Sequence, residues 1–138
     1  MERLRNCLSR WPSAIFSLIT IIVILWLTLA PKPFGDETPQ LFPGADKLVH
    51  ALMFGFLTAM LLLDWQRKNR WHPTRLIRII LCGSASALLG ITIEFIQDSM
   101  GMGRGFEIGD IIADIIGAYS IGILWKLLQH FWLPIRLE

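Results

Sequence analysis

The sequence predicts an all-α membrane protein: a four-helix transmembrane bundle whose N- and C-termini are both cytoplasmic. Apolar residues make up 54% of its 138 residues, and charged residues only 17%. A soluble domain usually carries about 25% charged residues. The apolar residues gather into long runs separated by short charged patches, a pattern typical of a multi-pass membrane protein. At this length a single domain is expected.

The first apolar run, residues 13–30, contains no charged residue. Its length suits one membrane crossing, which needs about 17–25 residues. A basic tail, residues 1–12, precedes the run, so a cleaved secretory signal is the alternative interpretation. We favour a retained anchor because the run is longer than the apolar core of a signal peptide, which has about 7–15 residues.

Three further helices are predicted in the rest of the chain. A loop at residues 31–45, which is rich in proline and glycine, separates them from the first run. Apolar runs predict these helices at about 46–63, 76–97 and 108–128. A cationic turn at 64–75 joins the first two of them, and a glycine-rich stretch follows the second. Residues 129–138 form a short cytoplasmic tail.

The basic residues predict the orientation. They concentrate in the N-terminal tail, in the turn between the second and third helices, and at the C-terminal end. With four crossings these regions lie on one side, and the positive-inside rule makes that side cytoplasmic. We therefore expect a protein of the inner (cytoplasmic) cell membrane. Its partner is the lipid bilayer, and its other two loops face outward.

Polar residues collect at the outward ends of the last three predicted helices. They are Asp46, Lys47 and His50 on the second helix, Glu94 and Gln97 on the third, Arg104 in the next loop, and Asp110 and Asp114 on the fourth. Spacings of three or four residues place the members from one helix on a shared face. Small residues continue these faces, which indicates contact with neighbouring helices rather than lipid. We therefore expect one polar site beneath the outer membrane surface.

This predicted site holds more acids than bases, and close carboxylates in a poorly solvated place cannot all stay ionised. Neighbouring acids beside a histidine suit acid–base chemistry. The candidate catalytic residues are therefore Asp46, His50 and Glu94. The candidate ligand-binding residues are Lys47, Gln97, Arg104, Asp110 and Asp114, with the Arg104 guanidinium as an anion anchor.

Other classes of function find little support in the sequence. Neither cysteine has a partner at a metal-binding spacing, and there is no nucleotide loop, nucleic-acid-binding patch or nucleophile elbow. A divalent cation would neutralise the excess negative charge. No HExxH motif is present, so zinc is not specifically indicated. The sequence also leaves any cofactor and the oligomeric state unassigned.

The polar residues occur in the order Asp46-Lys47-x-x-His50, Glu94-x-x-Gln97, Arg104, Asp110-x-x-x-Asp114-x-x-Gly117. This order resembles the VanZ-like family of small multi-pass membrane proteins, named for a member linked to low-level teicoplanin resistance. The resemblance covers about 46–128 as a three-helix core and leaves the first helix mostly outside the motifs. The family usually has Asn where this chain has Asp114, so Asp114 is expected either to be protonated or to pair with Arg104. The resemblance implies no particular reaction.

Three functions are consistent with these residues. The leading hypothesis is a VanZ-like protein that binds or acts on an envelope lipid, a cell-wall precursor or a glycopeptide at its outer face. The second is a non-catalytic membrane scaffold or binding protein whose polar cluster only joins helices. The third is a small proton- or cation-coupled transporter, which is less favoured because the inner halves of the helices carry little charge. The sequence leaves open whether the protein is an enzyme.

Overall fold

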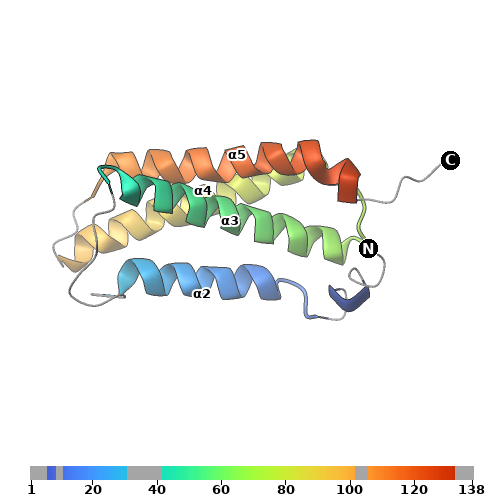
Figure 1. Ribbon diagram of the computed structural model, residues 1–138. Coiled ribbons are helices and arrows are strands. Elements are labelled where there is room, and N and C mark those ends of the chain that lie inside the picture. Colours follow the sequence, from blue (N-terminus) through green and yellow to red (C-terminus); the bar gives the residue numbers. More distant parts are fainter. Residues whose placement is uncertain (1–5, 9–10, 31–41, 102–105, 133–138) are drawn as a thin grey trace.

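The computed structural model describes residues 6–8, 11–30, 42–101 and 106–132. Its long elements are the helices α2 (Ile15–Leu29), α3 (Ala45–Lys68), α4 (Leu76–Met100) and α5 (Ile108–Trp132). Figure 1 shows them running alternately back and forth along one bundle, so that α2 and α4 end where α3 and α5 begin. The described residues contain no strand, which confirms the predicted all-α class.

Three of the described helices are long and apolar enough to cross a membrane, namely Ala45–Lys68, Leu76–Met100 and the Ile108–Gln129 part of α5. The remaining helix, α2, has 15 residues. At 1.5 Å per residue it is about 22 Å long, shorter than the hydrocarbon core of about 30 Å. By length the structure thus supports three of the four predicted crossings, with α2 as a shorter apolar helix in the same bundle.

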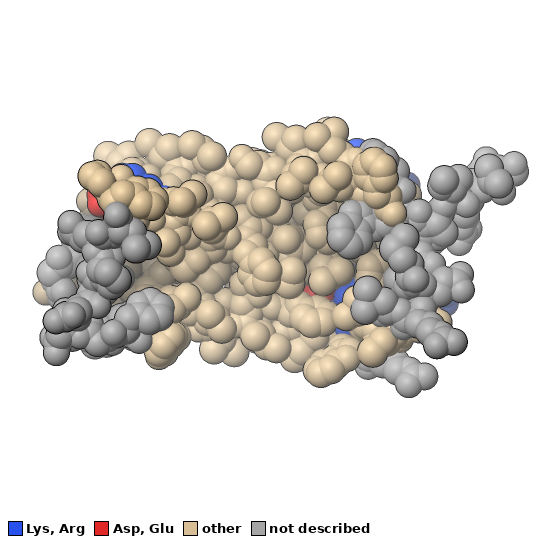
Figure 2. Space-filling view, viewed as in Figure 1, with Lys and Arg blue, Asp and Glu red and all other residues tan. Residues whose placement is uncertain are grey.

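The outer surface of the bundle is apolar. Large side chains such as Ile22, Leu52, Leu88 and Ile116 are each more than half exposed. On the face drawn in Figure 2, the charged side chains lie toward the two ends, with a broad uncharged band between them. A bilayer solvates apolar side chains and disfavours charged ones, so this surface fits a lipid environment.

The parallel helices α3 and α5 approach each other closely at small residues. A Cβ added to Gly117 of α5 would overlap the backbone of Ala51 in α3. Gly55, one turn further along α3, also lies against the Gly117 backbone. Small residues allow such backbone contact between membrane helices. Because the two helices are parallel, this contact brings their N-terminal turns together at one end of the bundle.

The centre of the bundle is a small apolar core. Ile24 of α2, Phe54 and Leu57 of α3 and Ile93 of α4 form a buried cluster that joins the three helices. The hydroxyl of Ser86 in α4, which is also buried, donates a 2.7 Å hydrogen bond to the carbonyl of Phe54. Polar groups at this depth are thus satisfied by helix carbonyls, as buried groups usually are.

Polar side chains from other helices hold both ends of α2. Its N-cap residue, Ala14, has no side chain to cap the helix. Instead, the carboxylate of Asp64 in α3 accepts hydrogen bonds from the backbone N (2.8 Å) and Oγ (2.7 Å) of Ser17. At the other end, Nε2 of Gln97 in α4 donates to the carbonyl of Thr28 at 2.8 Å. The bond to the Ser17 backbone N–H and the bond to the Thr28 carbonyl satisfy backbone groups near the ends of α2, where a helix leaves such groups unpaired.

Asp64 also forms a buried ion pair with Arg67. The Arg67 guanidinium donates to the carbonyls of Leu8 and Trp11 and lies 4.6 Å from the ring centroid of Phe16. The helix that contains Asp64 was predicted to end near residue 63. That prediction is wrong, because α3 continues to Lys68. Asp64 and Arg67, which were predicted to lie in the cationic turn, have partners inside the bundle.

Candidate functional site

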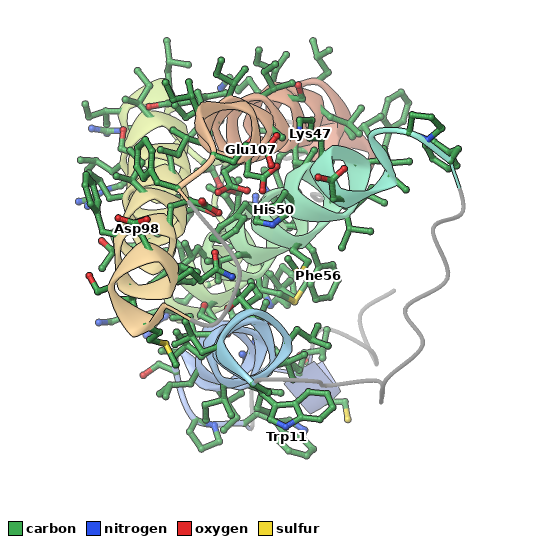
Figure 3. All side chains as sticks on the ribbon, turned by 90° about the vertical axis from the view of Figure 1, so that its left-hand side faces the viewer. Trp11, Lys47, His50, Phe56, Asp98 and Glu107 are labelled. Atoms are coloured by element: carbon green, nitrogen blue, oxygen red, sulfur yellow. The ribbon has the colours of Figure 1, made fainter. Side chains whose placement is uncertain are left out.

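The titratable residues predicted to meet lie at the end of the bundle where α3 and α5 begin. Figure 3 looks onto this end and shows His50 enclosed by α3, α4 and α5. The side chain of His50 is 12% exposed, whereas Lys47 and Glu107, closer to the rim, are 38% and 53% exposed. The site therefore has a buried layer around His50 and an exposed layer around Lys47.

His50 and Asp114 form the centre of the buried layer. Nδ1 of His50 lies 3.0 Å from Oδ1 of Asp114, whose side chain is fully buried. Nδ1 and Oδ1 share this hydrogen bond, so Nε2 is the ring nitrogen left to face the other groups. A Cβ at Gly90 of α4 would collide with the Asp114 carboxylate, so glycine is required at position 90 for this packing.

Two further carboxylates surround the free side of the imidazole. Nε2 of His50 lies 3.8 Å from Oδ2 of Asp110, too far for a hydrogen bond. Potential ligand atoms of His50, Glu94 and Asp110 all lie within 4.8 Å of one another. The three residues come from α3, α4 and α5, so the structure places the polar groups of three helices in one cluster.

Glu94 is the most isolated acid of this cluster. Glu94 is only 2% exposed, and its Oε2 accepts a 3.3 Å hydrogen bond from the backbone N–H of Glu107. Among the described residues, no lysine or arginine pairs with it. A buried carboxylate without a cation is costly, so a proton, a protonated His50 or another cation beside Glu94 would stabilise it.

Lys47 supplies positive charge to the exposed layer. Its ammonium lies 2.5 Å from Glu107, 3.2 Å from Asp46 and 3.4 Å from Oδ1 of Asp110. A Cβ at Gly109 would collide with the Lys47 side chain, so this glycine leaves room for it. Lys47 thereby joins the first turns of α3 and α5. Glu107 was not among the predicted site residues. Its position three residues before Asp110 could have indicated that the two acids lie together.

The other predicted site residues are placed differently. Asp46 is 54% exposed and contacts Lys47 at the rim. The amide of Gln97 points to α2, where it binds Thr28, and does not join the His50 cluster. Arg104, the proposed anion anchor, lies outside the described residues. The geometry therefore divides the predicted set into a buried cluster, a rim and a helix contact.

A bundle of membrane-length apolar helices with a histidine and carboxylates clustered near one end defines the class: a helical membrane protein with a polar cluster at one end of its bundle. The chain belongs to the VanZ/LLP1 family, whose family model matches residues 11–129. This confirms the VanZ-like resemblance and extends it over α2. Neither a curated protein nor a solved structure matches the chain.

Proposed function

We propose that this protein lies in the cytoplasmic membrane with both termini inside, and that its polar cluster binds an envelope component from the outer leaflet. The ligand classes are an envelope lipid, a lipid-linked cell-wall precursor or a glycopeptide. The distribution of basic residues supports the orientation. The depth of the cluster, within the first turns of α3 and α5, suits a ligand whose polar part lies at the headgroup level.

The observation that carries the proposal is the hydrogen bond between His50 and Asp114 beside Glu94, a buried acid that no lysine or arginine of the described residues pairs with. An ionisable residue inside a membrane helix costs up to about 2.5–3.5 kcal/mol, although less near the ends. Lys47 already joins α3 to α5 through its ion pairs. Asp114 and Glu94 also bond to neighbouring elements, but no lysine or arginine among the described residues pairs with Glu94. A ligand that supplies positive charge would offset the cost of burying it.

Each residue has a distinct role in this proposal. His50 and Glu94 supply the buried polar contacts to the ligand, and Asp114 orients the imidazole through Nδ1. Lys47 contacts an anionic part of the ligand at the rim, and Arg104 would add a second anion contact there.

A transporter has less support from the buried residues of α3. Between His50 and Asp64 the fully buried side chains of this helix are Phe54, Leu57, Leu62 and the untitratable Thr58. A proton or cation path through the membrane usually carries titratable or liganding side chains along its length. The titratable groups of α3 instead divide into two separate ends.

Binding can be measured with full-length protein in lipid nanodiscs, by native mass spectrometry of a titrated lipid-linked cell-wall precursor. We expect the wild type to bind and His50→Ala to bind at least about tenfold more weakly. Asp98→Asn is the matched control, because Asp98 lies at the same end of the bundle but is exposed. In Figure 3, Asp98 lies on α4 away from His50. Equal binding by the wild type and His50→Ala would contradict the proposal.

The same variants distinguish binding from scaffolding in cells. If the cluster binds an envelope component, His50→Ala and Glu94→Gln insert normally but change teicoplanin susceptibility relative to the wild type. If the cluster only joins helices, both variants reduce the amount of folded protein in the membrane. Membrane abundance and antibiotic susceptibility, measured on the same cultures, separate the two.

A further inference from the structure

We propose that His50, Glu94 and Asp110 form a site for a divalent first-row transition ion such as Zn²⁺ or Mn²⁺. One ligand comes from each of α3, α4 and α5. The inference deepens the proposed function and rests on it for the role of the ion, which is to receive an oxygen of the bound headgroup. The site itself is argued from the geometry of the described residues.

The three side chains already surround one point. Their ligand atoms lie within 4.8 Å of one another, and Nε2 of His50 is 3.8 Å from Oδ2 of Asp110. Around a tetrahedral zinc ion with bonds of about 2.0–2.2 Å, neighbouring ligand atoms are roughly 3.3–3.5 Å apart. The ligand atoms therefore have to move closer together to reach this spacing.

The second observation is the orientation of the imidazole. A histidine that binds a metal commonly donates its other ring N–H to a carboxylate, which fixes the tautomer and the ring. Asp114, which is fully buried, lies 3.0 Å from Nδ1 of His50 in this arrangement. The free nitrogen, Nε2, is the one that faces Asp110. Asp114 is therefore a positioning residue and not a ligand.

The charges select this cluster over its neighbour. A second group with suitable spacing consists of Asp46, Glu107 and Asp110. The ammonium of Lys47 contacts all three of these acids and already supplies positive charge there. In the buried cluster, Glu94 has no lysine or arginine partner among the described residues. A metal ion would supply the missing positive charge.

The donor set also selects the kind of ion. Mg²⁺ and Ca²⁺ prefer sites made only of oxygen ligands, whereas imidazole nitrogen suits zinc and the other transition ions. Three protein ligands leave a coordination position open, as in catalytic zinc sites. The oxygen of a headgroup phosphate or hydroxyl would occupy that position.

The test uses the full chain, purified with a tag that contains no histidine and stripped with EDTA. Isothermal titration with Zn²⁺ and with Mn²⁺, checked by elemental analysis after dialysis, measures affinity and stoichiometry. We expect about one ion per chain. Affinity should fall about 10–100-fold in Glu94→Gln and about tenfold in Asp114→Asn, as for ligand and outer-shell changes. Asp98→Asn should bind as the wild type does.

Folding is monitored in parallel, because His50→Ala removes a buried hydrogen bond. The near-isosteric Glu94→Gln and Asp110→Asn keep side-chain volume, and their thermal unfolding without metal shows whether they fold. A folded Glu94→Gln that binds Zn²⁺ and Mn²⁺ as tightly as the wild type would overturn the metal site. So would a wild type that binds neither ion.

Titration of the lipid-linked precursor with and without EDTA separates the two proposals. Loss of precursor binding in EDTA, restored by Zn²⁺ or Mn²⁺, supports both. Precursor binding that persists in EDTA overturns the role of the ion and leaves the proposed function standing. A stoichiometric metal ion without precursor binding supports the metal site but contradicts the proposed function.

Discussion

Gly90 of α4 lies directly against the carboxylate of Asp114 in α5, so closely that a Cβ at position 90 would collide with it. A missing side chain on one helix therefore makes room for a buried acid on the next. In that room Asp114 shares a hydrogen bond with Nδ1 of His50 in α3. The orientation of the histidine thus depends on a glycine that does not touch it.

Replacing Gly90 by alanine should displace Asp114 and destabilise the protein by about 1–3 kcal/mol, the usual cost of overpacking. Zn²⁺ binding should weaken with it. Gly83→Ala is the control, because its Cβ would meet only the ring of Tyr119, at 3.2 Å, and that ring can move. Thermal unfolding in detergent measures both variants. Equal losses of stability would contradict the assigned role of Gly90.

Gly117→Ala should be among the most damaging glycine substitutions. Its Cβ would overlap backbone atoms of Ala51, which cannot move without separating α3 from α5. We expect a loss of at least about 3 kcal/mol, the upper end for overpacking. In Gly122→Ala the nearest atom is a side-chain methyl of Ile79 at 2.9 Å, so the loss should be smaller. Unfolding in SDS titrations ranks the two variants, and the reverse order would refute the close contact of α3 and α5.

Asp64→Asn should release the N-terminal end of α2 and leave the Arg67 guanidinium buried without its ion-pair partner. Removing one member of a buried pair costs about 3–5 kcal/mol. The double variant Asp64→Asn/Arg67→Met should lose less than the sum of the two single losses, because the pair is coupled. A double-mutant cycle from denaturation curves measures this coupling. Additive losses would show that the ion pair contributes nothing of its own.

Gln97→Leu should cost about 1 kcal/mol, the typical net value of one hydrogen bond. Hydrogen exchange should increase near Thr28, the carbonyl that loses its donor. Precursor and metal binding should be unchanged, because this amide does not face His50. If Gln97→Leu instead weakens precursor binding as much as Glu94→Gln while α2 stays protected, Gln97 is a ligand-binding residue, as the sequence suggested.

The meeting of His50, Glu94, Asp110 and Asp114 could be predicted from the sequence because it follows from two regular features. Helix periodicity sets which residues share a face, and alternating helix direction sets which ends lie together. Both depend only on residue spacing and on the positions of the apolar runs. The helix centres were predictable for the same reason.

The contacts of α2 could not be predicted in this way. Glu94 and Gln97 are three residues apart, and at 3.6 residues per turn their side chains diverge by about 60°. That divergence is enough for Glu94 to face α5 while Gln97 faces α2. Asp64 was predicted to lie in a cationic turn because its partner Ser17 is recognisable only once α2 is placed beside α3. Its other partner, Arg67, is three residues further along α3 and becomes recognisable once the helix is extended to Lys68.

The shortness of α2 has a consequence for the surrounding lipid. With 15 residues it is about 22 Å long, whereas the 25 residues of α4 extend about 37 Å. Because Asp64 and Gln97 fix its two ends, α2 cannot slide to correct this mismatch. Acyl chains beside α2 must shorten or disorder, which thins the membrane locally. Stability in reconstituted vesicles should therefore decline as the acyl chains are lengthened.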